Sequence, residues 1–285
     1  MRSGNESIAG LFKLLVSSLQ PLYGPGESAS IARIVFEDAF LLYDLKSEQA
    51  FPETHFYRFE EILTRLLRYE PVQYILGQAD FFGLKFEVNP HVLIPRQETE
   101  ELVLWILDSC AEAGLPGNRL LDVGSGSGCI PIVLKKKLPS MDIVSVDISP
   151  QALEVARRNS EKHHAAVDWR ETDFLRPENW PSLGAYDLIV SNPPYIDPSE
   201  KERMSPNVLA FEPPLALFTS SDPMEFYQAI AGFARENLNA GGNIFVEFNE
   251  FRLEDAAEIF KKTGFKRAEG RTDINDNQRM LLIFN

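Results

Sequence analysis

The chain has 285 residues, of which 44% are hydrophobic and 25% charged, and its formal net charge is -14. This length predicts about two domains with enough apolar residues for a sizeable core. The acidic balance disfavours a protein that grips phosphates and suits a basic protein partner, while the two cysteines and four histidines show neither disulfide-scaffold nor metal-ligand spacing. We therefore expect no metal site and no direct contact with nucleic acid.

The first region, residues 1–75, is predicted to be a small helical bundle. Apolar side chains recur at helical spacing in three stretches, 8–19, 31–45 and 59–67. A Pro- and Gly-rich break at 21–26 should separate the first two helices, with Ser28 or Ser30 capping the second. The amphipathic start is not a signal peptide, and no segment approaches the ~18 apolar residues of a membrane span. We expect a cytoplasmic monomer without a membrane contact.

Residues 76–95 change character, and residues 96–285 then alternate strands with helices. Aromatic and β-branched residues around Gly83 predict a β-hairpin that links the two larger regions. The predicted strands are 119–123, 142–147, 167–170, 186–191, 243–248 and 280–284. The predicted helices between them are 129–138, 150–163, 224–239 and 252–263. This alternation with nearly continuous apolar strands predicts an α/β fold: a doubly wound, mostly parallel Rossmann-like sheet with helices on both faces. Ligands of such sheets bind at the carboxyl ends of the strands.

A glycine-rich turn follows the first strand and opens a helix. It consists of Gly124, Ser125, Gly126, Ser127 and Gly128. Glycines allow positive φ and close approach of the backbone to a ligand, although a tight strand–helix connection would also use them. Asp147 ends the next strand, where a carboxylate can accept both hydroxyls of a ribose. Asp173 and Phe174 follow the third strand, where they can bind an adenine amino group and pack on its ring. These residues predict a nucleoside-containing cofactor.

The tetrapeptide Asn192-Pro193-Pro194-Tyr195 directly follows the fourth strand. Proline restricts the residue before it to extended geometry, and the alternative interpretation is a proline-rich β-turn. The Asn192 side-chain oxygen and the Pro193 carbonyl can accept both hydrogens of a planar NH2 group, such as an amide. Tyr195 can stack on that group, while Pro194 helps to fix the turn. Together they can direct the nitrogen lone pair at an electrophilic methyl group by orientation and electrostatics. Asn192 is also expected to border the cofactor.

The glycine turn, the strand-tip aspartate and the Asn-Pro-Pro-Tyr motif together resemble class I S-adenosylmethionine-dependent methyltransferases. Two groups share these motifs: adenine-N6 nucleic-acid methyltransferases and protein glutamine-N5 methyltransferases. The rest of the chain is similar to the bacterial release-factor glutamine methyltransferases, in segments 71–77, 93–96, 191–196, 211–213 and 276–279. This resemblance implies S-adenosyl-L-methionine as the cofactor and methylation of the glutamine in the Gly-Gly-Gln motif of peptide chain release factors. It also implies that residues 96–285 are the methyltransferase domain. The acidic balance and the separate helical region suggest that residues 1–75 dock the protein substrate.

The adenine-N6 alternative is disfavoured by charge. Residues 1–75 hold seven Lys and Arg but ten Asp and Glu, a poor surface for DNA. A cofactor-binding module without activity is a third possibility, against which the intact Asn-Pro-Pro-Tyr motif argues. The sequence departs from the family after Glu247, and it gives no chemistry for Glu247, Arg96 or Glu212. Which release factor is preferred, or whether a ribosomal protein is modified instead, stays open.

Overall fold

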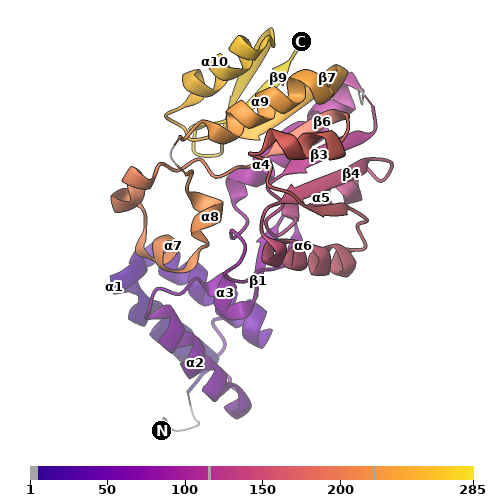
Figure 1. The fold of residues 1–285 in the computed structure, drawn as a ribbon. Helices are drawn as coiled ribbons and strands as arrows, with labels where there is room; N and C mark the ends of the chain where they lie inside the picture. Colours follow the sequence, from indigo (N-terminus) through magenta and orange to yellow (C-terminus); the bar gives the residue numbers. More distant parts are fainter. Residues whose placement is uncertain (1–5, 115–116, 221) are drawn as a thin grey trace. The chain divides into compact units, whose positions relative to one another are not determined.

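The computed structural model describes residues 6–114, 117–220 and 222–285 (Figure 1). Contacts between Cα atoms divide the chain into two compact units. The first comprises Met1–Gln78 and Ser205–Phe211, and the second comprises Ala79–Met204 and Glu212–Asn285. The candidate functional residues all belong to the second unit.

The first unit is helical, as predicted. Its elements are α1 (Ile8–Ile34), the π-helical turn η1 (Val35–Ala39), the short turn η2 (Glu53–His55), α2 (Phe56–Leu66), α3 (Val72–Leu76) and α7 (Pro206–Phe211). Its core is rich in aromatic rings, and Phe36 lies edge-on to Phe12, Phe40 and Phe59. Edge-to-face packing of this kind stabilises beyond simple apolar burial.

The predicted break between the first two helices is present. Gly24, inside the predicted stretch 21–26, leaves helical geometry with φ +75° and ψ 172° and divides α1 into two helices. The prediction that Ser28 or Ser30 caps a second helix is wrong. Their hydroxyls donate to the carbonyls of Gly24 and Gly26 one turn earlier, which is the pattern of serines inside a helix.

The second unit contains a hairpin and a doubly wound sheet. The hairpin strands are β1 (Gln78–Phe81) and β2 (Leu84–Glu87). The sheet strands are β3 (Arg119–Val123), β4 (Asp142–Asp147), β5 (Asp168–Glu171), β6 (Tyr186–Ser191), β7 (Leu238–Glu247), β8 (Arg267–Thr272) and β9 (Gln278–Phe284). The helices are α4 (Gln97–Ala113), α5 (Cys129–Lys137), α6 (Pro150–His163), α8 (Pro214–Leu217), α9 (Glu225–Asn237) and α10 (Leu253–Thr263), with short turns η3 (Pro177–Ser182) and η4 (Pro198–Arg203).

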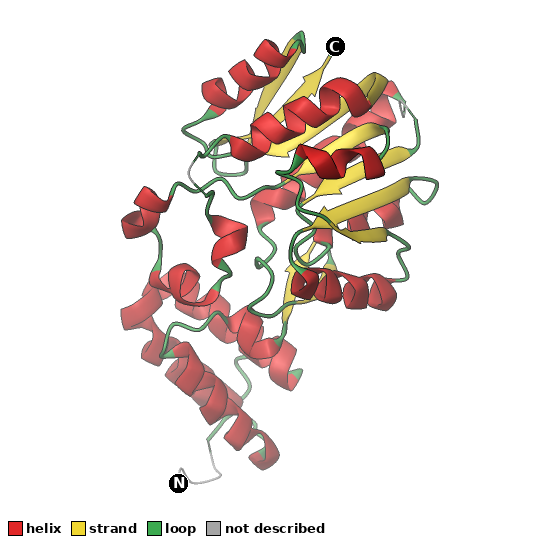
Figure 2. Ribbon diagram, in the orientation of Figure 1, coloured by secondary structure: helices red, strands yellow, loops and turns green. Residues whose placement is uncertain are grey.

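Helices cover both faces of this sheet, as Figure 2 shows. Alternate residues of a strand point to opposite faces, so Leu121 and Val123 enter the core shared with α9 and α10. Leu120, between them, enters the core shared with α4 and α5. Burial on both faces explains why the strands read as continuous apolar runs rather than alternating ones.

Strand order places the ends of the functional segments together. The order is β5-β4-β3-β6-β7-β9-β8, with β3 parallel to both β4 and β6. After β3 the chain adds β4 and β5 on one side of β3 and then crosses to add β6 and β7 on the other side. On that second side, Val123 of β3 is in register with Ser191 of β6. The glycine turn and the Asn-Pro-Pro-Tyr segment begin one residue later on adjacent strands, at the switch point where such sheets bind ligands.

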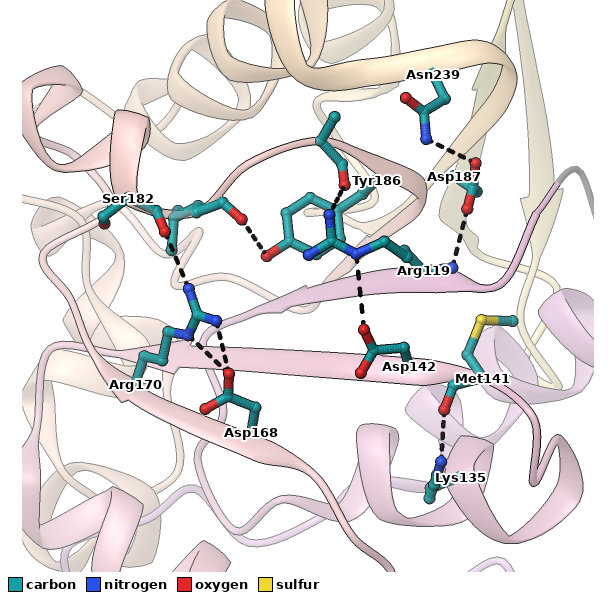
Figure 3. Close-up of polar contacts among 12 residues, drawn as sticks. Arg119, Lys135, Met141, Asp142, Asp168, Arg170, Ser182, Tyr186, Asp187 and Asn239 are labelled. Atoms are coloured by element: carbon teal, nitrogen blue, oxygen red, sulfur yellow. Dashed lines mark hydrogen bonds and ion pairs between the residues drawn. The ribbon is translucent and has the colours of Figure 1, made fainter.

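Charged residues at the opposite, amino edge of the sheet bind each other (Figure 3). The Arg119 guanidinium donates to the Ala185 carbonyl at 2.8 Å and lies 4.9 Å from the centre of the Tyr186 ring. Asp187 accepts from the Arg119 backbone N–H at 2.9 Å and from the Asn239 amide at 2.8 Å. These contacts connect the starts of neighbouring strands.

The end of the sheet was only partly predicted. β8 was not expected, because it is mostly exposed and lacks an apolar pattern, yet it pairs antiparallel with β9. β7 begins at Leu238, five residues before the predicted start, in a polar and Gly-rich stretch that extends the strand. Across the described residues, no helix has the length and apolarity needed to cross a membrane.

Candidate active site

A cavity of about 330 Å³ lies at the carboxyl ends of β3, β4 and β6. Residues 124–127 of the glycine turn, Asp147 and Asn192 all line it, although they are far apart in sequence. Gly128 does not line it, and a Cβ there would lie 2.8 Å from the Trp169 ring. The segments 91–96 and 213–220 and the residues Glu225 and Phe226 also line it. Among the described residues, no group of three His, Cys, Asp or Glu side chains is arranged to hold a metal ion.

The glycine turn presents backbone to the cavity. Gly124 and Gly126 have φ values of +89° and +51°, which disfavour other residues. A Cβ on Gly126 would meet no atom within 4 Å, so the space above this turn is open to a ligand. A Cβ on Gly124 would lie 3.9 Å from the Asn192 carbonyl oxygen, which shows how closely the turn approaches the Asn-Pro-Pro-Tyr segment.

The serines of the turn line the cavity and also form hydrogen bonds with the surrounding protein. The Ser125 hydroxyl lies 2.6 Å from that of Ser145, which donates to the buried Asp122 carboxylate. Since Ser145 uses its proton on Asp122, Ser125 must be the donor to Ser145. The Ser127 carbonyl accepts from the buried Asn159 amide at 2.9 Å. These bonds hold the turn rigidly against β4 and α6.

Asp147 is held directly beside the turn, as the sequence predicted for its position. One carboxylate oxygen accepts from the Gly126 N–H and the other from the Ser149 N–H, both at 2.9 Å. Burial raises the pKa of Asp147, and these backbone donors oppose the rise. A carboxylate offers about four acceptor sites, so capacity for two further hydroxyl donors is left. The geometry therefore fits a ribose.

Asp173 and Phe174 also line the cavity, together with Ile148. Asp173 accepts from Arg176 at 2.9 Å and from the Leu175 N–H at 3.2 Å. Phe174 is 3% exposed, and its ring packs edge-on against Phe233. Ile148, which sequence reasoning missed, is 45% exposed next to Asp147, an apolar surface on which a flat ring can pack.

The four residues of the tetrapeptide occupy different environments. Asn192 and Pro194 line the cavity, while Pro193 is buried. The Tyr195 ring packs against the core, and its hydroxyl donates to Glu247 at 3.3 Å. The predicted stacking of Tyr195 on a substrate amide stays a prediction.

Two buried residues that sequence reasoning left without a role contact this segment. The Asn192 amide NH2 donates to the Thr99 hydroxyl at 2.9 Å. That hydroxyl donates in turn to Glu247 at 2.7 Å. Burial raises the pKa of Glu247 to about 7, against the lowering effects of the Thr99 hydrogen bond and the nearby Arg279. Only a weak signal marked these residues, since Glu247 lies near the end of a predicted strand and Thr99 lies at a helix start.

Arg96 and Glu212 connect two segments that line the cavity. The side chain of Glu212 is 1% exposed and pairs with the Arg96 guanidinium. Its second oxygen accepts from the Ile94 backbone N–H at 3.3 Å. The pair therefore connects the segment 91–96 to the start of the segment 213–220, both of which line the cavity.

A doubly wound sheet with this glycine turn, strand-tip aspartate and Asn-Pro-Pro-Tyr segment at one cavity defines a Rossmann-like methyltransferase. The family model "Methyltransferase small domain" matches residues 102–209, and "PrmC N-terminal domain" matches residues 36–77. The hMettl16 catalytic domain in complex with MAT2A 3'UTR hairpin 6 shares the fold, with 16% identity, a TM-score of 0.55 and coverage of 71% of this chain and 76% of that chain.

Curated relatives define the family more closely. The release factor glutamine methyltransferase of Flavobacterium psychrophilum is 36% identical over 94% of this chain and 95% of its own length. That of Bacteroides thetaiotaomicron is 38% identical over 93% of this chain and 95% of its own length. The chain belongs to the release factor glutamine methyltransferase family.

Proposed function

We propose that this chain transfers a methyl group from S-adenosyl-L-methionine to the side-chain amide nitrogen of the glutamine in the Gly-Gly-Gln motif of peptide chain release factors, in support of translation termination. The observation that carries the proposal is the Asn192 amide. It lies at the cavity with its NH2 group bound to Thr99, which keeps its oxygen as an acceptor. The names of the relatives point to the same reaction.

The cofactor half of the cavity fits S-adenosyl-L-methionine, which supplies a methyl group on a positively charged sulfur. The open space above Gly126 would let such a ligand lie directly against the backbone of the turn. Asp147 has acceptor capacity for two ribose hydroxyls. Ile148 and Phe174 offer apolar surface for the adenine, with Asp173 beside them as an acceptor for its amino group.

The acceptor half works by orientation. An amide nitrogen is a weak nucleophile because its lone pair is delocalised into the carbonyl. The Asn192 oxygen and the Pro193 carbonyl would accept its two hydrogens, and this would hold the nitrogen with its lone pair facing the methyl group. The same acceptors stabilise the positive charge that develops on the nitrogen during transfer. Tyr195 and Pro194 would shape the slot around the flat amide.

The first unit is proposed to dock the release factor. Leu41, Tyr43 and Tyr57 are at least 70% exposed there, unusual for large apolar side chains. Replacing Tyr43 and Tyr57 with serine should raise KM for the intact factor. It should leave methylation of a short Gly-Gly-Gln peptide and the cofactor affinity unchanged, whereas an unchanged KM for the intact factor contradicts docking at these residues.

The direct test of function is incubation with labelled cofactor and purified release factor, followed by mass mapping of the modified peptide. We expect a single methyl group on the Gly-Gly-Gln glutamine. A release factor with glutamine replaced by glutamate should stay unlabelled. Label in a ribosomal protein instead, or in the adenine of a nucleic acid, would contradict the proposed substrate.

A further inference from the structure

Thr99 lines the cavity beside Asn192, and Glu247 is bonded to the Thr99 hydroxyl. Thr99 is 3% exposed near the start of α4, and Glu247 is 2% exposed at the end of β7. They form a continuous chain of hydrogen bonds with Asn192, of 2.9 Å and 2.7 Å. Three segments that are distant in sequence therefore meet at one amide.

The direction of this chain follows from the donors available. In its ionised form Glu247 only accepts, so the single proton of the Thr99 hydroxyl goes to that carboxylate. Thr99 can then offer Asn192 only a lone pair, which an amide oxygen cannot bind. The amide must turn its NH2 group to Thr99, and its oxygen is directed away from the hydroxyl.

Glu247 is itself fixed from its other side. Its second oxygen accepts from the Tyr195 hydroxyl at 3.3 Å. The positive charge of Arg279 favours the ionised form of Glu247. Arg279 is held by Asp273, whose side chain is fully buried, at 3.1 Å. This network ties the last strand of the sheet to the orientation of Asn192.

We infer that Thr99 and Glu247 are positioning residues for methyl transfer: through their hydrogen bonds they set the Asn192 amide so that its oxygen faces the acceptor nitrogen. The inference rests on the proposed function, because it takes Asn192 to hold the substrate amide. Neither residue touches the reacting atoms. Their loss should therefore change the rate of transfer more than the binding of either substrate.

The main test compares Thr99→Val, which removes the hydroxyl at nearly constant shape, with Thr99→Ser, which keeps it. We expect Thr99→Val to lower kcat by about 10- to 100-fold, as misplacement of a catalytic group does. KM for the release factor and Kd for the cofactor should change less than about threefold, which is small beside the ~10²-fold loss of rate that misplacement can cause. Thr99→Ser should restore most of kcat. Thr263→Val is a matched control, because it removes a hydroxyl that bonds only the Ile259 carbonyl within α10.

A second experiment tests whether Thr99 affects kcat through Asn192. The Glu247→Gln side chain can donate its NH2 group to the Thr99 hydroxyl, so Thr99 is free to donate to the Asn192 oxygen instead. The Asn192 amide is then no longer held in one orientation, and kcat should fall by a similar factor. In an Asn192→Ala background, measured by single turnover and mass spectrometry, Thr99→Val should cause almost no further loss. An equal loss in both backgrounds would show that Thr99 acts elsewhere, and an unchanged kcat in Thr99→Val would overturn the inference.

A third readout does not depend on activity. The side-chain amide signals of Asn192, identified by their absence from Asn192→Ala, should shift in Thr99→Val and return in Thr99→Ser. Unshifted signals in Thr99→Val would contradict the inference even in an active enzyme. Failure of the proposed function is a separate result: the wild-type protein would then show these shifts but transfer no methyl group to the release factor.

Discussion

The two edges of the same parallel sheet use similar residues for opposite purposes. At the amino edge, Asp187 and Asp168 are bound by Arg119, Asn239 and Arg170. At the carboxyl edge, acids and amides lie at a cavity of about 330 Å³ and keep capacity for further partners. A strand-end aspartate is thus a structural brace on one edge and a ligand group on the other.

The difference lies in what surrounds each group. The carboxyl-edge acids Asp122, Asp147 and Glu247 all have pKa values raised by burial. Buried acids with raised pKa values are destabilising unless they are held, and they cluster at functional sites. Substitutions at the carboxyl edge should therefore affect function and, at buried acids, the pH dependence of stability, whereas those at the amino edge should affect stability alone.

The largest effect is expected at Asn192. Asn192→Ala removes the proposed amide acceptor and should lower turnover ~10²–10³-fold, as loss of one oriented hydrogen bond in an active site does. Asn192→Asp should also be impaired, because its charge acts on the sulfonium centre and the bond to Thr99 loses its donor. Turnover and cofactor affinity should be measured in the same variants. A fully active Asn192→Ala enzyme, or a defect confined to cofactor binding, contradicts the assigned role.

A pH-dependent loss of stability is expected from Glu247. Its pKa rises from 4.5 to about 7 on folding, so the folded protein binds the proton more tightly than the unfolded chain. This contribution is fully present below the unfolded pKa and is lost as pH rises through the folded pKa. The difference corresponds to about 3 kcal/mol between acid and alkaline solution.

Urea unfolding at pH 4.5 and pH 8 measures this contribution. The Glu247→Gln variant should show a weaker decline in the free energy of unfolding than the wild type. Asp122, Tyr195, Arg279 and Glu98 remain in both proteins, so the comparison isolates Glu247. Identical declines would show that Glu247 does not titrate as described.

Asp147→Ala should weaken cofactor binding by about 1–3 kcal/mol, because the proposed ribose acceptor is lost. Calorimetry on the folded variant measures this directly. The free energy of unfolding should fall less than the free energy of cofactor binding, since the two N–H groups that donate to Asp147 can bind water in the open cavity instead. Unchanged affinity would remove Asp147 from the cofactor site.

The smallest effect is expected at the amino edge. Asp187→Ala leaves the Arg119 N–H and the Asn239 amide without their acceptor and should cost about 1–2 kcal/mol of unfolding free energy. Its kcat and cofactor affinity should match those of the wild type at a temperature where it is folded. A loss of kcat in Asp187→Ala without a loss of stability would contradict the assignment of a purely structural role to the amino edge.

The sequence predicted the local parts of this protein well. Apolar strands, the glycine turn and the positions of Asp147 and Asn192 are contiguous signals, so they could be placed at strand ends. It failed where geometry is not local. β8 has no apolar pattern because it is an exposed edge strand, and the second helix starts at the predicted break but before Ser28 and Ser30, which therefore do not cap it.

Sequence by itself determined the family, the doubly wound sheet and the two motifs that meet at its switch point, because each is written in neighbouring residues. Only the tertiary structure decided how Asn192 is oriented. Thr99, Asn192 and Glu247 come from a helix start and the ends of two strands, and only packing brings them within hydrogen-bonding distance. A threonine and a glutamate in such positions are ordinary in sequence, and their role comes from the single hydroxyl proton of Thr99, which the ionised Glu247 can only accept.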